Sequence, residues 1–130
     1  MLELFPESAR VDRGDLEVGG VGARELAERF GTPLAVYCEG TIRARAREVR
    51  EAVPDAGVFY ATKAFPNVAV LQLLAEEGFG ALVATFGELS FARAAGLPGE
   101  RLIVHGNAKS DEQLRAASEA GALVVLDAEG

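Results

Sequence analysis

Short, continuously apolar runs recur along the chain about 20 residues apart, which is the spacing of successive strand–helix units. Because apolar and polar residues do not alternate within these runs, the runs are typical of parallel strands that are buried in a sheet. We therefore predict a series of five strands. They cover residues 34–38, 58–61, 81–84, 102–105 and 123–127.

Stretches with helical periodicity lie before and between the apolar runs. In residues 41–53, for example, Ile42 and Ala46 fall on one stripe, as in a helix that buries one face. Ser110 is a predicted N-cap, and Gln113 completes a capping box with it. The predicted helices cover residues 23–30, 41–53, 66–77 and 87–95, and a last one begins after Ser110 and ends at Gly121.

Alternating strands and helices indicate an α/β fold with a parallel sheet. A complete open sheet of flavodoxin type is one candidate, and the first part of a (β/α)₈ barrel, which needs about 250 residues, is the other. The sequence stops just after the fifth predicted strand, where another helix is expected, and this favours a partial barrel. Residues 11–18 are predicted to form a hairpin that turns at Arg13 and Gly14, so residues 1–22 are expected to form an N-terminal extension that contains this hairpin.

The composition is that of a globular domain, with 49% hydrophobic and 25% charged residues. A net charge of -7 repels nucleic acid and anionic membrane surfaces, so neither is an expected partner. No apolar run approaches the ~20 residues that span a bilayer, and we expect a cytoplasmic protein. The single cysteine, Cys38, cannot form an internal disulfide, and its apolar surroundings predict a place in the core. No spacing of metal ligands is present.

The ends of the predicted strands carry the candidate chemistry, because ligands of α/β sheets bind there. Lys63 and Lys109 are the only lysines among 13 basic residues. Lys63 directly follows an apolar strand, where desolvation would lower its pKa and favour a nucleophilic amine; a lysine in a solvated loop is the alternative. His105 is the only histidine, and it could stack on a ring or move a proton, or bond to the backbone. Lys109 is expected to be structural, and Glu88 to interact with a helix dipole.

Four motifs at these positions resemble a known family. They are Phe-Gly-Thr-Pro-Leu-Ala-Val-Tyr at residues 30–37, Tyr-Ala-Thr-Lys-Ala-Phe at 60–65, Gly-Glu-Leu at 87–89 and His-Gly-Asn-Ala-Lys-Ser at 105–110. In this order they resemble the N-terminal part of the diaminopimelate decarboxylases, which belong to the fold-type III decarboxylases that depend on pyridoxal phosphate. The lysine motif alone would also suit alanine racemases and ornithine or arginine decarboxylases.

The resemblance implies a partial (β/α)₈ barrel of the alanine racemase type in residues 23–130, with pyridoxal 5'-phosphate as cofactor. Lys63 would be the catalytic lysine that forms the Schiff base, and the cofactor-binding residues would be Lys63, Ala61, Thr85 and His105. The implied reaction converts meso-2,6-diaminopimelate into L-lysine and carbon dioxide, a step of lysine biosynthesis, in an enzyme that is usually a homodimer.

The sequence departs from the family's pattern at Leu82, where an acidic residue is common, and we expect this to affect catalysis. The family's later motifs are absent from the chain, so the chain alone is expected to be inactive as a decarboxylase. Two alternatives to the leading function stay open. One is another fold-type III decarboxylase that acts on ornithine or arginine, and the other is a non-catalytic α/β domain that binds a small molecule.

Overall fold

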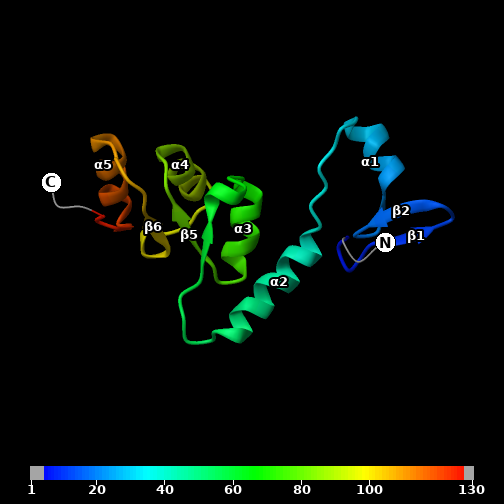
Figure 1. Ribbon diagram of the computed structural model, residues 1–130, viewed down its shortest axis with the longest axis horizontal. Helices are drawn as coiled ribbons and strands as arrows, with labels where there is room; N and C mark the ends of the chain where they lie inside the picture. The colour runs from blue at the N-terminus through cyan, green and yellow to red at the C-terminus, as the bar shows by residue number, and fades with distance from the viewer. Residues whose placement is uncertain (1–4, 128–130) are drawn as a thin grey trace. The chain divides into compact units, whose positions relative to one another are not determined.

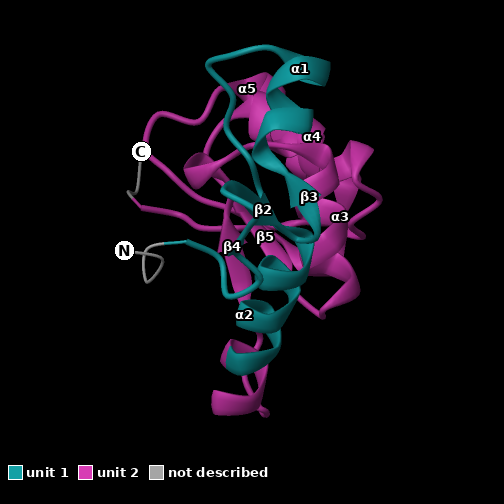
Figure 2. Ribbon diagram, turned by 90° about the vertical axis from the view of Figure 1, so that its right-hand side faces the viewer, with its two compact units in different colours: residues 1–48 teal, residues 49–130 magenta. Residues whose placement is uncertain are grey.

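The computed structural model describes residues 5–127 of the 130-residue chain. Within it, the chain divides into two compact units, Met1–Glu48 and Val49–Gly130 (Figure 2). The N-terminal unit holds a small antiparallel sheet, a helix that follows it and most of a second helix, and the C-terminal unit holds the parallel sheet. None of the helices within residues 5–127 is long and apolar enough to cross a membrane.

The sheet of the N-terminal unit is an antiparallel hairpin with a third short strand in the order β1-β2-β3. Its turn lies at Arg13 and Gly14, as predicted, and these residues have φ angles of 49° and 83°. Positive φ at both central positions is the conformation that matches the twist of paired strands. The elements are β1 (Arg10–Asp12), β2 (Asp15–Val18), β3 (Val21–Gly22) and α1 (Ala23–Phe30).

The predicted strand at residues 34–38 is wrong. This segment has no strand assignment, and no strand in the described part of the chain pairs with it. Leu34, Val36 and Tyr37 are 41%, 46% and 57% exposed. A strand needs a hydrogen-bonded neighbour, and the strands of this unit pair with one another instead. The segment is therefore apolar, as a strand would be, but it lacks the hydrogen bonds to a neighbouring strand that would make it one.

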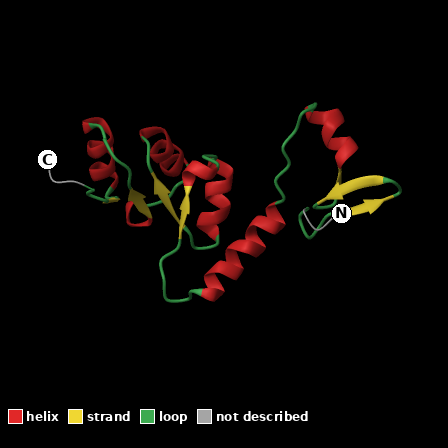
Figure 3. Ribbon diagram, in the orientation of Figure 1, coloured by secondary structure: helices red, strands yellow, loops and turns green. Residues whose placement is uncertain are grey.

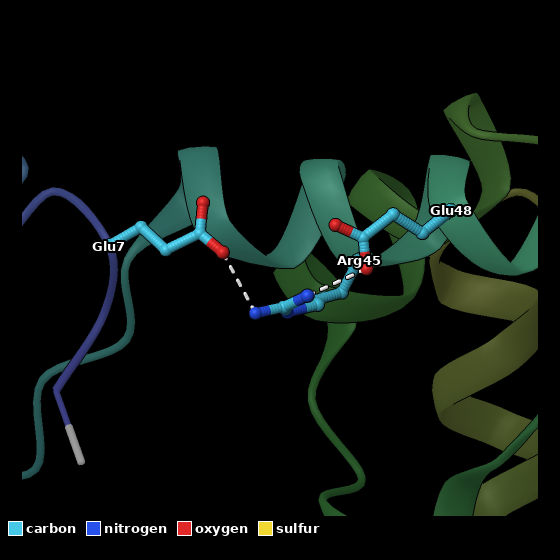
Figure 4. Close-up of polar contacts among 3 residues, drawn as sticks. All are labelled: Glu7, Arg45 and Glu48. Carbon is cyan, nitrogen blue, oxygen red and sulfur yellow. Dashed lines mark hydrogen bonds and ion pairs between the residues drawn. The ribbon is translucent and has the colours of Figure 1, made fainter. Parts of the chain in front are cut away.

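Helix α2 (Glu39–Ala52) begins directly after this segment, where the amide of Ile42 donates to the carbonyl of Cys38. On its surface, the Arg45 guanidinium bonds to Glu48 at 2.7 Å and to Glu7 at 2.8 Å (Figure 4). All three side chains are more than half exposed. Exposed ion pairs contribute about 0–1 kcal/mol each, so this cluster stabilises the N-terminal segment only weakly.

The C-terminal unit contains a four-stranded parallel sheet whose strands follow one another in chain order (Figure 3). The register pairs Ala61 with Leu82 and Leu82 with Ile103. A helix follows each of the first three strands. The elements are β4 (Phe59–Ala61), α3 (Val68–Glu76), β5 (Gly80–Val83), α4 (Phe86–Ala94), β6 (Leu102–Val104), α5 (Asp111–Ala120) and β7 (Leu123–Val124).

The helices of this unit share one face of the sheet (Figure 1). Ala81 and Val83 are fully buried on that face and belong to one core cluster with Leu71 of α3, Leu89 of α4 and Ala117 of α5. Open sheets of flavodoxin type have helices on both faces and a reversal in strand order, whereas a (β/α)₈ barrel has consecutive strands with all helices outside. The arrangement is that of a partial barrel, which confirms the predicted fold class.

The helices begin at side-chain caps. Asn67, Thr85 and Ser110 accept from backbone amides of α3, α4 and α5, respectively, at 3.2 Å. Helix α3 therefore starts after Asn67 rather than at residue 66, where we predicted it. Ser110 is the predicted N-cap, but the second half of the predicted capping box is wrong. The side-chain amide of Gln113 does not return to Ser110 and donates instead to the carbonyl of Ala84.

Candidate functional site

The candidate residues Ala61, Lys63, Thr85 and His105 lie at the carboxyl ends of three neighbouring parallel strands. Because β4, β5 and β6 run in parallel and in register, these ends form one edge of the sheet. The amide of His105 donates to the carbonyl of Val83 at 2.9 Å, which continues the pairing between β5 and β6 up to this edge. The structure thus brings together strand ends that lie far apart in the sequence.

Lys63 lies in a single turn of 3₁₀ helix, Thr62–Ala64, that directly follows β4. Its side chain is exposed, so of the two alternatives that the sequence left open, a desolvated and a solvated lysine, this chain shows the solvated one. Within residues 5–127, no hydrogen bond or ion pair engages its amine. The position therefore presents a primary amine that is accessible to a ligand.

The amine of Lys109 is engaged, in contrast to that of Lys63. Its Nζ donates to the carbonyl of Gly106 at 2.5 Å and to Asp127 Oδ1 at 2.8 Å, and its side chain is only 7% exposed. The hydrogen bond from Lys109 lowers the pKa of the Asp127 carboxyl. Lys109 therefore has a structural and electrostatic role, as its position predicted, and Lys63 is the accessible one of the two lysines.

A hydrogen-bond network holds the strand end that precedes Lys63. Thr62 is fully buried, and its Oγ1 lies 2.6 Å from Glu88 Oε2 and 2.9 Å from the carbonyl oxygen of Leu82. The same carboxylate oxygen of Glu88 accepts from the amide of Ala84 at 2.8 Å. The network joins the end of β4 to the end of β5 and to the first turn of α4, so it fixes the backbone on which Lys63 stands.

Sequence reasoning missed this network. It assigned Glu88 to the helix dipole and gave no role to Thr62. The available signal was a hydroxyl at the end of an apolar strand, because a buried polar group needs a partner within reach. Nothing in the sequence, however, identified Glu88 of the next unit as that partner.

The loop that follows β6 adopts an unusual backbone conformation. Gly106 has a φ of 105° and Ala108 a φ of 52°. The left-handed region costs a residue with a side chain about 1–2 kcal/mol, so neighbouring contacts must hold Ala108 there. The bond from Lys109 to the Gly106 carbonyl is one such contact. His105, at the start of this loop, is half-buried, and Thr85 at the neighbouring strand end is exposed although its hydroxyl caps α4.

Leu82 lies on the sheet face that the helices leave open. Its neighbours Ala81 and Val83 face the helices, and side chains alternate along a strand. Leu82 is half-buried and pairs in register with Ala61 and Ile103. In a closed barrel this face is the interior, so Leu82 presents an apolar side chain below the edge that carries the candidate residues.

Cys38 does not lie in a buried core, contrary to our prediction. Its thiol is partly exposed in the N-terminal unit, where Ser8 Oγ lies 3.3 Å from Cys38 Sγ. Ser8 Oγ accepts the amide of Gly19, so its hydroxyl hydrogen is available to the sulfur. Hydrogen bonds from Ser8 and then from Thr41 lower the pKa of the Cys38 thiol from 9.0 to about 7.

We expect alkylation of Cys38 to follow this lowered pKa, because the thiolate is the nucleophile and is present above the pKa. The rate should rise through a midpoint near pH 7. Ser8→Ala should move the midpoint upward and lower the rate at pH 7 about threefold, since one hydrogen bond contributes about 1 kcal/mol and the thiolate fraction falls accordingly. Iodoacetamide labelling followed by peptide mapping across pH measures both. A midpoint near 9 in the unmodified protein would contradict the assignment.

No group of three or more His, Cys, Asp or Glu side chains suited to a metal ion is found among the described residues. The groups that the structure places at this edge are an accessible amine, a half-buried imidazole and a hydroxyl. An amine of this kind binds an aldehyde covalently, which is the reaction by which a lysine attaches a carbonyl ligand.

The chain is similar to known proteins in both its sequence and its fold. Residues 39–129 match the family model described as the pyridoxal binding domain of pyridoxal-dependent decarboxylases. A diaminopimelate decarboxylase of Actinosynnema pretiosum subsp. auranticum is 52% identical over 114 residues, which are 88% of this chain and 26% of that protein. The chain thus spans about a quarter of the length of the curated relatives it matches.

Solved structures of similar fold include two whose bound molecules are known. The diaminopimelate decarboxylase of M. jannaschii in complex with L-lysine has a TM-score of 0.77 and 32% identity, over 90% of this chain and 29% of that one. The lysine/ornithine decarboxylase of Vibrio vulnificus in complex with putrescine has a TM-score of 0.76 and 30% identity, over 82% of this chain and 30% of that one.

Proposed function

Because the chain belongs to the pyridoxal-binding domain family of the pyridoxal-dependent decarboxylases, we propose that it is the N-terminal part of a diaminopimelate decarboxylase. Such an enzyme converts meso-2,6-diaminopimelate into L-lysine and carbon dioxide. The observation that carries the proposal is the exposed amine of Lys63 at the carboxyl end of β4, together with the engagement of Lys109 elsewhere. The identity to relatives of that name, 52% in one case, supports the choice of substrate.

The residues at this edge fit pyridoxal phosphate in their chemistry. The cofactor carries an aldehyde, and Lys63 provides the accessible amine that an aldehyde requires. Ala61 is small, and Thr85 and His105 place polar groups at the two neighbouring strand ends. When bound, pyridoxal phosphate supplies an electron-accepting ring that takes up the electron pair left by the departing carboxylate.

Different residues of the chain would bind the cofactor, hold the backbone in place and move protons. Lys63 would bind the cofactor, and its Nζ accepts a proton as the neutral amine and donates one as the ammonium. Glu88 and Thr62 fix the backbone before Lys63 through the bonds of 2.6 and 2.8 Å to the Glu88 carboxylate. The His105 imidazole, half-buried at the end of β6, would stack on the cofactor ring or move a proton at its ring nitrogens.

The proposal extends to the organisation of the protein. Residues 1–22 form an N-terminal extension with the hairpin, and residues 23–130 form the first part of the cofactor-binding barrel. The net charge of -7 supports a small-molecule amino acid, rather than nucleic acid or a membrane surface, as the partner. We also propose that the full-length protein is a homodimer in the cytoplasm, as its resemblance to the family implies.

A second candidate is a decarboxylase for ornithine, arginine or lysine, favoured by the similarity to the Vibrio vulnificus structure with putrescine. Carbon dioxide release from the full-length protein with pyridoxal phosphate distinguishes the two. We expect meso-2,6-diaminopimelate to exceed L-ornithine, L-arginine and L-lysine by at least about 100-fold in kcat/KM, since a site built for a polar group rejects analogues that lack it. Preference for ornithine would favour the second candidate, and cofactor binding without any turnover would favour a binding module.

Replacement of Leu82 tests the side-chain environment of the open sheet face. We expect Leu82→Asp in the full-length protein to raise, by about one unit, the pH midpoint at which the absorption of the bound cofactor changes. An anion near a lysine favours its charged form and raises its pKa. A pH titration of the absorbance, run beside a thermal melt, measures the effect.

Leu82→Asn is the matched control, because it changes polarity without charge and should leave the midpoint in place. The competing result is a melt at much lower temperature, since burial of an unpaired carboxylate costs several kcal/mol. Unchanged midpoints and melts for both variants would mean that Leu82 does not face the cofactor.

A further inference from the structure

Gln113 is a buried polar side chain that helix capping does not explain. It lies in the first turn of α5 and is 6% exposed. Ser110 caps this helix through the backbone amide of Gln113, so the side-chain amide is free for another partner. Its Nε2 donates to the carbonyl of Ala84 at 3.1 Å, at the end of β5. A buried amide that reaches the end of a neighbouring strand holds that strand end in place.

The backbone of Ala84 is held from both sides. Gln113 bonds its carbonyl, and Glu88 Oε2 accepts its amide at 2.8 Å. The same carboxylate oxygen lies 2.6 Å from the hydroxyl of Thr62, which is fully buried. Thr62 directly precedes Lys63 in the 3₁₀ turn. A continuous set of contacts therefore leads from α5 to the residue beside the reactive amine.

We propose that Gln113 is a positioning residue for Lys63. By holding Ala84, it keeps the Glu88 carboxylate directed toward Thr62 and thereby sets the position of the turn that carries the Lys63 amine. Gln113 does not itself reach Lys63, so its contribution passes through Ala84 and Glu88. That the position of the Lys63 amine matters for cofactor attachment rests on the proposed function. The link from Gln113 to Thr62 is argued from the hydrogen bonds alone.

The test uses Gln113→Met in the full-length protein, because methionine is unbranched and similar in length but cannot donate to Ala84. Glu119→Met, at an exposed position of the same helix, is the matched control. The first readout needs no cofactor. The amide of Phe65 donates to the carbonyl of Thr62 at 3.1 Å, so its hydrogen exchange reports opening of the turn that contains Lys63.

We expect the Phe65 amide to exchange about tenfold faster in Gln113→Met and unchanged in Glu119→Met. We also expect the affinity for pyridoxal phosphate to fall about tenfold, measured well below the melting temperature of both variants. Faster exchange confined to α5, with residues 62–65 unchanged, would overturn the proposal and leave Gln113 with a merely local role. If the exchange of Phe65 rises as expected but the unmodified protein binds no pyridoxal phosphate, the proposed function fails and the positioning link stands.

Discussion

Lys63→Arg is expected to abolish covalent attachment of pyridoxal phosphate in the full-length protein. A guanidinium has a pKa above about 12 and stays protonated, so it cannot act as a nucleophilic amine at neutral pH. We expect turnover of meso-2,6-diaminopimelate to fall at least about a thousandfold, which corresponds to roughly 4 kcal/mol of transition-state stabilisation. The absorption spectrum of the variant with added cofactor, together with carbon dioxide release, measures both effects.

Lys109→Arg is the matched control for this experiment. Arginine keeps the positive charge beside Asp127, and Lys109 makes its contacts to Gly106 and Asp127 rather than to a ligand. We expect this variant to retain cofactor attachment and to lose stability by no more than about 1.5–3 kcal/mol, the range for a hydrogen bond to a charged group. Loss of attachment in Lys109→Arg, with attachment retained in Lys63→Arg, would reverse the two assignments.

Gly99→Ala is expected to have the largest effect on stability. Gly99 begins a short 3₁₀ turn, Gly99–Arg101, that packs against the end of α5. A Cβ atom at this position would overlap the carbonyl oxygen of Ala120 and the carbonyl carbon of Gly121. These are backbone atoms that cannot rotate away, so we expect a loss of about 3 kcal/mol in the free energy of unfolding, at the upper end for overpacking. Urea unfolding of the full-length protein measures the loss.

Gly40→Ala provides the control, because the two glycines differ in their surroundings. Gly40 lies in the first turn of α2, and an added Cβ would meet nothing within 4 Å. Replacing glycine with alanine lowers the conformational entropy of the unfolded chain. This variant should therefore be as stable as the unmodified protein, or more stable by up to about 1 kcal/mol. Equal unfolding midpoints for the two variants would contradict the packing of the 3₁₀ turn against α5.

Patterns local to one element predicted most of the C-terminal unit. The last four apolar runs became β4 to β7, and α5 ends at Gly121, as predicted, where the φ of 71° is one that glycine readily adopts. Local patterns failed where the outcome depended on a distant neighbour. Residues 34–38 have the composition of a strand, but a strand forms only when another strand pairs with it.

The candidate site, too, was predicted where it depends on local patterns and missed where it depends on distant partners. The positions of Lys63 and His105 followed from the ends of apolar runs, because parallel strands bring their carboxyl ends to one edge. The partners of Thr62 and Gln113 lie in other strand–helix units, and no periodicity identifies such pairs. The sequence left open whether Lys63 is desolvated or exposed, since desolvation depends on which segments surround a side chain rather than on its own sequence neighbours.

The most direct test of this account is the site at which pyridoxal phosphate attaches to the unmodified full-length protein. Borohydride reduction of the protein with bound cofactor, followed by proteolysis and mass spectrometry, locates the pyridoxyl group. We expect the group on Lys63 within residues 60–65, with Lys109 unmodified because its amine is bonded to Gly106 and Asp127. A pyridoxyl group on Lys109 or on any other lysine, with Lys63 unmodified, would contradict it.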